Sequence, residues 1–133
     1  MIDFANSYTA PLVRRMWKTC FGDTDESMDI FFSRKYRDEN TLIYFEGNEA
    51  VASLQMLSYS ITFYGEKIPF AYLAGLCTLP EYRQKGYMAQ LIYRAHEVVE
   101  RRNIPLAILI PAEEWLYHFY EKYGYTQVFE KDD

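Results

Sequence analysis

The sequence lacks the features that mark several common classes of protein. Its 133 residues include 2 cysteines and 2 histidines, at no spacing typical of a metal site or a disulfide framework. No apolar run approaches the roughly 20 residues of a membrane span, and the N-terminus shows no basic and then apolar signal pattern. We therefore expect a cytoplasmic protein with no metal centre. Cys20, in a helical pattern, and Cys77, in a strand pattern, are expected to be buried thiols in a reducing compartment.

An excess of positive charge is also missing. The chain has 14 Lys and Arg against 19 Asp and Glu, which gives a net charge of −5. Nucleic acids and acidic membranes are bound by clustered, unopposed Lys and Arg side chains. We therefore expect no nucleic-acid and no membrane partner. The sequence also shows no internal repeat and no low-complexity linker.

Apolar and aromatic residues are abundant. The chain is 50% hydrophobic and contains 13 Tyr and 9 Phe, which is ample for the core of one domain over residues 1–133. Because tyrosine combines an apolar ring with a hydroxyl group, some of these side chains are expected to line a partly hydrated cleft.

The first half of the chain predicts two helices followed by three strands. Apolar residues recur at helical spacing over Thr9–Phe21 and Ser27–Tyr36. The runs Leu42–Phe45, Val51–Tyr64 and Ile68–Leu79 are rich in strand-forming residues and are separated by turn residues. These three runs predict an antiparallel meander.

The second half predicts alternating helices and strands. The pattern indicates a helix over Gly86–Arg102, a buried strand over Leu106–Ile110, a helix over Glu113–Tyr123 and a final strand over Tyr125–Phe129. A strand, helix and strand of this size form a parallel crossover. The predicted fold is therefore α/β (α+β), with a mixed central sheet that joins the meander to a βαβα unit.

The junction between the third strand and the long helix is the most informative segment. Gly75 inside the strand predicts a bulge or a close approach by a ligand. Arg83 and Lys85 flank a turn in which Gly86 opens the helix, and a helix N-terminus attracts phosphate or pyrophosphate. An ordinary connection with solvated charges is the alternative, because a lone Arg-x-x-Gly motif is weak.

Two segments together carry a family resemblance. The string PEYRQKG at 80–86, which opens a helix, and the string FYEKYGY at 119–125 closely resemble the GNAT family of acetyl-CoA-dependent N-acetyltransferases. The predicted element order matches that fold across nearly the whole chain. The family places Gly or Ala where this chain has Met88, and a bulky residue there resembles the Eis-like branch.

The resemblance implies a set of cofactor-binding groups. The pyrophosphate of coenzyme A would contact Arg83 and the backbone N–H groups of the turn, contributed by Gln84, Lys85, Gly86, Tyr87 and Met88. The pantetheine arm would pair with backbone groups of Leu76, Cys77 and Thr78, and the N–H near Leu76 would stabilise the thioester oxyanion.

The resemblance also assigns Tyr120 as the general acid that protonates the departing thiolate. A core position in an aromatic helix is the alternative for this tyrosine. No motif identifies the general base: Glu113 and Glu114 follow a buried strand, but they are equally typical of the first turn of a helix. His96 and His118 are expected to be structural.

These observations predict an N-acetyltransferase that uses acetyl-CoA as cosubstrate and acts on a small-molecule or peptide amine. The alternative is a non-catalytic acyl-CoA-binding sensor or interaction module with the same fold. Members of the family usually close with two further strands, and after Phe129 only four residues remain. We therefore expect either the N-terminal part of a longer protein or a homodimer that covers the exposed strand edge.

Overall fold

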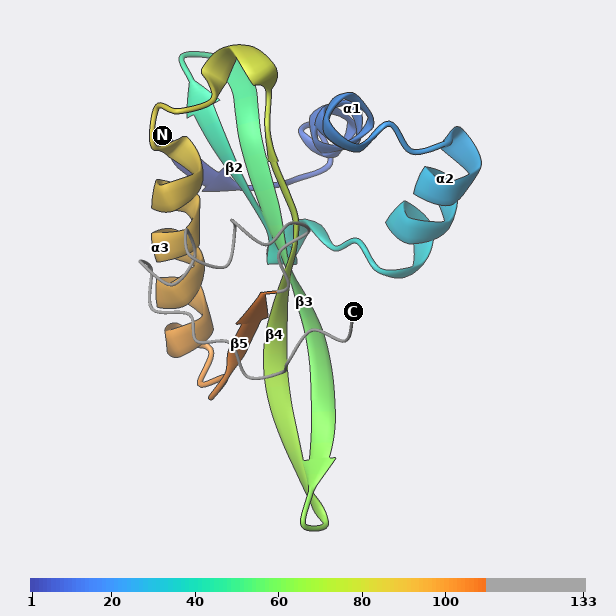
Figure 1. Cartoon of the computed structure of the whole chain (residues 1–133), viewed down its shortest axis with the longest axis vertical. Coiled ribbons are helices and arrows are strands. Elements are labelled where there is room, and N and C mark those ends of the chain that lie inside the picture. The colour runs from blue at the N-terminus through green and yellow to red at the C-terminus, as the bar shows by residue number, and fades with distance from the viewer. Residues whose placement is uncertain (110–133) are drawn as a thin grey trace, which may run out of the picture.

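The computed structural model describes residues 1–109 of the chain, which form a five-stranded mixed sheet with helices on both faces (Figure 1). The strands are β1 (Ile2–Phe4), β2 (Thr41–Glu46), β3 (Glu49–Phe63), β4 (Glu66–Thr78) and β5 (Ala107–Leu109). The helices are α1 (Ala10–Phe21), α2 (Asp25–Arg34) and α3 (Tyr87–Arg101), with short 3-10 turns η1 (Asp38–Asn40) and η2 (Pro80–Tyr82). The spatial order of the strands is β1-β2-β3-β4-β5.

The predicted meander and the helices before and after it are confirmed. Strands β2, β3 and β4 pair antiparallel, and β5 pairs parallel with β4 as a crossover requires. Helix α2 begins two residues before its predicted start because the Thr24 side chain accepts a hydrogen bond of 3.1 Å from the Ser27 N–H. The predicted helix Glu113–Tyr123 and strand Tyr125–Phe129 lie outside the described residues.

Strand β1 is an element that the sequence did not predict. It is three residues long and pairs antiparallel with β2 at the edge of the sheet. Three residues are too few to show the alternation that identifies a strand. Its pairing with residues about forty positions away therefore defines it.

The two faces of the sheet are covered by different helices. Helix α3 packs on one face, where its Leu91, Ile92 and Ala95 are fully buried against Leu54 and other sheet residues. Helix α1 lies on the opposite face with α2 beside it (Figure 1). Ala50 at the start of β3 belongs to the core under α1, whereas Ala52, Leu54 and Met56 belong to the core under α3.

A bulge interrupts the pairing of β3 with β4. Ser53 pairs with Cys77 but Gln55 pairs with Ala74, so β4 holds one extra residue at this point. Gly75 lies in the bulge with a φ of +61°, in the left-handed region that favours glycine. The bulge predicted at Gly75 is therefore confirmed. Within the described residues, β5 pairs with β4 only as far as Leu73, two positions before the bulge.

The expectation of two free thiols is wrong. Cys20 of α1 and Cys77 of β4 form a disulfide, with 6.0 Å between their Cα atoms. The two cysteines are separated by 57 positions, and only the packing of α1 on the sheet brings them within bonding range.

None of the helices in residues 1–109 has both the length and the apolar character that crossing a membrane requires.

Candidate functional site

The connection from β4 to α3 leaves a helix N-terminus open. Gly86 precedes α3 with a φ of +81°, and Gln84 also adopts a positive φ, of +64°. Among the described residues no side chain caps this helix, and its first turn contains no acidic residue. The first N–H groups of α3 therefore have no intrahelical partner, and the positive end of the helix dipole is not neutralised.

Basic side chains surround this turn. The Arg83 Nε donates a hydrogen bond of 3.0 Å to the Thr78 carbonyl, which holds the guanidinium against the end of β4. The Lys85 ammonium lies 5.4 Å from the centre of the Tyr82 ring. Both basic residues are exposed. Two cations beside an uncapped helix N-terminus form an arrangement suited to a phosphate-containing anion.

Met88 lies in the first turn of α3. Its side chain is half-buried and packs against the apolar core beneath α3. The backbone N–H of a residue donates independently of its side chain, so a bulky side chain that packs inward leaves the N–H groups of the turn available.

Two glutamates that flank the β2–β3 turn accept hydrogen bonds from tyrosines of the β4–α3 connection. The Tyr82 hydroxyl donates to Glu49 Oε2 at 2.7 Å, and the Tyr87 hydroxyl donates to Glu46 Oε2. The pKa of Tyr82 and that of Tyr87 are each raised to about 12, and these hydrogen bonds are the largest cause. Both hydroxyls therefore remain protonated donors through the neutral range.

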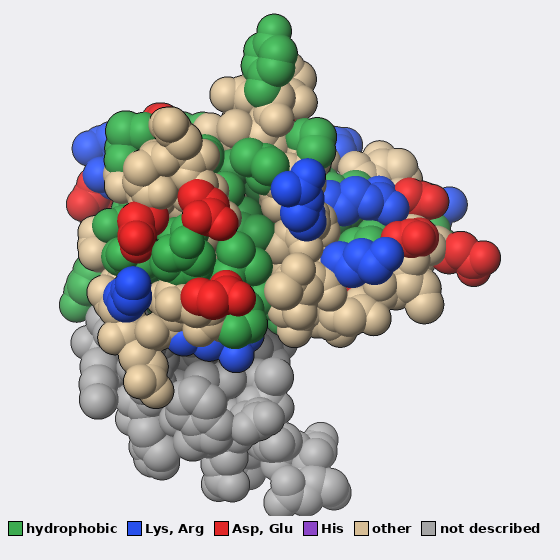
Figure 2. Space-filling view, turned by 90° about the horizontal axis from the view of Figure 1, so that it is seen from above, with side chains coloured by type: hydrophobic (Ala, Val, Ile, Leu, Met, Phe, Trp, Pro, Cys, Tyr) green, Lys and Arg blue, Asp and Glu red, His purple; other side chains and the backbone are tan. Residues whose placement is uncertain are grey.

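The Tyr87 ring also stacks on Tyr44 of β2, with 4.2 Å between ring centres. The sequence shows no sign that Glu46 and Glu49 support the turn, because the tyrosines lie up to about forty positions away along the chain with no local pattern. Figure 2 looks onto this end of the molecule, where acidic side chains lie among apolar ones.

The strand residues predicted for the pantetheine arm lie directly before this turn. Leu76 is half-buried beside the bulge, and Cys77 is 2% exposed and bonded to Cys20. Cys77 and Thr78 pair with β3 on one edge of β4, and the Thr78 carbonyl accepts from Arg83. The segment from Leu76 to Met88 thus consists of the end of a bulged strand followed by a basic turn.

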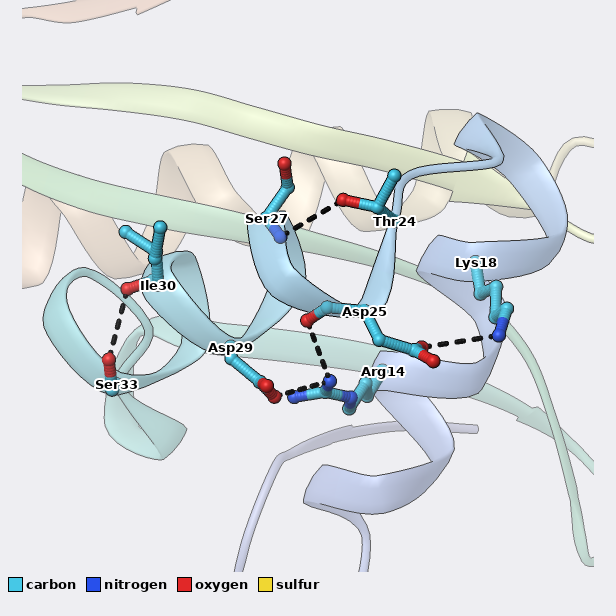
Figure 3. Close-up of polar contacts among 8 residues, drawn as sticks. All are labelled: Arg14, Lys18, Thr24, Asp25, Ser27, Asp29, Ile30 and Ser33. Carbon is cyan, nitrogen blue, oxygen red and sulfur yellow. Dashed lines mark hydrogen bonds and ion pairs between the residues drawn. The ribbon is translucent and has the colours of Figure 1, made fainter.

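Three acidic residues that follow α1 contact side chains of that helix. Asp23 Oδ2 accepts a hydrogen bond of 2.6 Å from the Trp17 indole. The Lys18 ammonium pairs with Asp25 at 3.2 Å, and the Arg14 guanidinium with Asp29 at 2.6 Å, so that α1 and α2 are joined (Figure 3). These carboxylates therefore stabilise the helix pair.

A cavity of about 590 Å³ opens on the α1 side of the β2–β3 turn. Its lining residues are Leu12, Arg15, Met16, Thr19, Glu46, Asn48, Glu49, Ala50 and Leu79. The cavity shares Glu46 and Glu49 with the supports of the basic turn. It does not contain the N-terminus of α3.

Four residues that were considered above for a catalytic or structural role lie outside the described residues. They are Glu113, Glu114, His118 and Tyr120. His96 lies on α3, and burial lowers the pKa of its imidazole below the usual value.

A family model matches most of the chain. Residues 2–128 match the family model described as acetyltransferase (GNAT) domain. The comparison with curated proteins gave no match.

Several solved structures share the fold. A GCN5-related N-acetyltransferase from Anabaena variabilis is 22% identical, with a TM-score of 0.79 over 90% of this chain and 30% of that chain. Eis1 from Mycobacterium abscessus is 17% identical, with a TM-score of 0.73 over 90% of this chain and 31% of that chain. A predicted acetyltransferase from Clostridium acetobutylicum, with acetyl-CoA, is 20% identical, with a TM-score of 0.77 over 100% and 95% of the two chains.

Identities below 25% show the fold alone, so the Eis-like branch stays a prediction. The present chain spans about a third of the length of the Anabaena protein and of Eis1.

Proposed function

Because this chain belongs to the GNAT acetyltransferase family, we propose that it binds acetyl-CoA and transfers the acetyl group to a primary amine. The observation that carries the proposal is the β4–α3 connection, which sets an uncapped helix N-terminus and two cations directly after a bulged strand. The acetyl-CoA in the related Clostridium structure supports the choice of cosubstrate.

The turn and the strand would bind different parts of acetyl-CoA. The pyrophosphate would be held by Arg83, Lys85 and the backbone N–H groups from Gln84 to Met88. The pantetheine arm would pair with backbone groups of Leu76, Cys77 and Thr78. Among the described residues β5 pairs with β4 only as far as Leu73, so the edge of β4 that faces β5 has no strand partner beyond the bulge at Gly75.

In the proposed reaction the neutral amine nitrogen attacks the thioester carbonyl carbon. The carbon–sulfur bond then breaks, the acetyl group stays on nitrogen, the amine gives up a proton and the thiolate gains one. The Leu76 N–H would stabilise the negative charge on the carbonyl oxygen, a contribution of roughly 3 kcal/mol per donor in acyl transfer. Tyr120 is proposed, on the family resemblance, to supply the proton to sulfur.

Titration calorimetry with acetyl-CoA tests the binding step. We expect saturable binding, weakened about tenfold by the double change Arg83→Ala and Lys85→Ala, because two charge-assisted contacts are lost. Lys67→Ala, which removes an exposed cation on the β3–β4 hairpin, serves as the control and should leave the affinity unchanged. No binding at high micromolar concentration to folded protein would refute the proposal.

Turnover is tested by the release of coenzyme A thiol across a panel of amines. Tyr120→Phe should lower kcat by roughly a hundredfold, with acetyl-CoA binding intact. Binding without turnover in the unchanged protein would favour the acyl-CoA sensor instead. Normal turnover in Tyr120→Phe would leave this tyrosine as a core residue.

We also propose that a second copy of the chain or a further domain completes the acceptor pocket, since the chain spans only 30% of the Anabaena relative. Light scattering combined with the turnover assay tests this point. A fully active monomer of residues 1–133 would contradict it.

A further inference from the structure

Gln55 is a fully buried amide without hydrogen-bond partners. It lies in the middle of β3, and its side chain is 0% exposed. Within the described structure, neither its Oε1 nor its Nε2 contacts a hydrogen-bond partner. An amide side chain can accept through its oxygen and donate twice through its nitrogen. Leaving all of this capacity unused in a protein interior is unfavourable and rare in native proteins.

The unpartnered amide lies at the bulge of β4. Gln55 pairs with Ala74, and its Oε1 is 3.0 Å from the point where a Cβ on Gly75 would stand. The ring of Trp17 approaches the same point from α1, with Cζ3 at 2.5 Å. The amide therefore lies beside the residue that precedes Leu76, on the face of the sheet opposite α3.

Packing alone does not account for a glutamine at this position. Its side chain shares the face opposite α3 with the Trp17 ring, and the described structure gives its amide no hydrogen-bond partner there. A methionine of nearly the same length would fill the space of Gln55 without leaving polar atoms unpaired. A ligand bound beside the bulge would supply the missing hydrogen bonds.

We propose that Gln55 positions the acceptor amine, an inference that rests on the proposed function. Its Oε1 accepts a hydrogen bond from an N–H of the amine and directs the nitrogen lone pair toward the thioester carbonyl held near Leu76. Its Nε2 donates to an oxygen beside the amine on the same acceptor. Because an amide does not titrate in this range, Gln55 is a positioning residue and not the general base.

The two ends of the amide define a class of acceptor. An amine flanked by a hydroxyl or carbonyl oxygen satisfies both Oε1 and Nε2, whereas a plain alkylamine satisfies only Oε1. The site therefore selects amino alcohols, amino sugars or amino amides over unsubstituted alkylamines. A site that hydrogen-bonds a substrate hydroxyl discriminates strongly against the analogue that lacks it, because its own polar group is then left unpaired.

Two probes of similar size test this selection. Glucosamine carries hydroxyl groups beside its amine, and cyclohexylamine has a ring of the same size with none. Binding of each to the protein loaded with coenzyme A is measured by calorimetry. We expect a preference for glucosamine of roughly tenfold, the difference associated with one buried hydrogen bond. Equal binding of the two probes, or binding of neither, would overturn the assignment.

Gln55→Met supplies the second measurement. We expect this variant to lose the preference for glucosamine and to have a higher Tm than the unchanged protein, since two unpaired buried groups are removed. A structural glutamine would give the reverse thermal result, so a lower Tm in Gln55→Met would overturn the proposal. A preference that survives the substitution would do the same.

Ser53→Ala is the matched control. Ser53 precedes Gln55 by two positions on the same face of β3 and is 2% exposed, but it pairs with Cys77 beyond the bulge. This variant should keep the glucosamine preference. Acetyl-CoA binding is measured in parallel: its absence from the unchanged protein refutes the proposed function, whereas its presence together with unselective amine binding refutes only the role of Gln55.

Discussion

Reduction of the Cys20–Cys77 disulfide is expected to lower the free energy of unfolding by about 4 kcal/mol. The bond joins residues 57 positions apart, and a cross-link that closes a loop of this length restricts the unfolded chain by about that amount in the chain-entropy relation. Because Cys77 is buried at 2% exposure, the reduced state also leaves two thiols confined between α1 and β4. Denaturant unfolding with and without dithiothreitol gives the difference directly.

The variant Cys20→Ala is the control for this experiment. It has no cross-link, so dithiothreitol should not shift its unfolding midpoint, and its stability should match that of the reduced protein. Titration of thiols in the unfolded, unreduced protein should find none. Two reactive thiols, or equal midpoints with and without reductant, would show that the bond does not form in solution.

Gly75→Ala is expected to lower the free energy of unfolding by about 3 kcal/mol. The backbone φ of +61° is unfavourable for alanine, at a cost of about 1 kcal/mol. The new Cβ would also lie 2.5 Å from Trp17 Cζ3, and overpacking of this kind costs about 1 to 3 kcal/mol. The indole is held by its 2.6 Å hydrogen bond to Asp23, so the ring has little freedom to move aside.

Gly22→Ala isolates the backbone part of this effect. Gly22 has nearly the same φ, +64°, but a Cβ there would have no neighbour within 4 Å. Its cost should therefore be about 1 kcal/mol, and the difference between the two variants measures the clash with Trp17. Combining Gly75→Ala with Trp17→Phe should recover part of the loss. Equal destabilisation by Gly75→Ala and Gly22→Ala would show that the close contact with Trp17 does not contribute to the free energy of unfolding.

The structure also separates the acidic residues into two roles that composition did not reveal. Asp25 and Asp29 join α2 to α1, and Asp23 binds the Trp17 indole of α1, while Glu46 and Glu49 accept hydrogen bonds from the tyrosines of the basic turn. Asp25 and Asp29 are paired with cations of α1, whereas Glu46 and Glu49 accept from neutral tyrosine hydroxyls and keep their negative charge beside the basic turn. Arg83 and Lys85 are the two exposed cations in the connection that leads into α3.

The local elements of this protein were determined by its sequence. The apolar spacing of Leu91, Ile92 and Ala95 predicted α3, because a helix places such residues on one face whatever packs against it. Gly75 predicted the bulge, and Arg83 with Gly86 predicted the basic turn, since backbone freedom and charge are properties of the residues themselves.

Only the tertiary structure decided which distant residues meet. The Cys20–Cys77 bond, the pairing of β1 with β2 and the hydrogen bond from Tyr87 to Glu46 each join segments separated by about forty positions or more. The unpartnered state of Gln55 depends in the same way on α1 covering that face of β3. Local patterns specify conformation and burial, but the contacts of a buried side chain depend on which segments the fold packs together, and those segments are far apart in the chain.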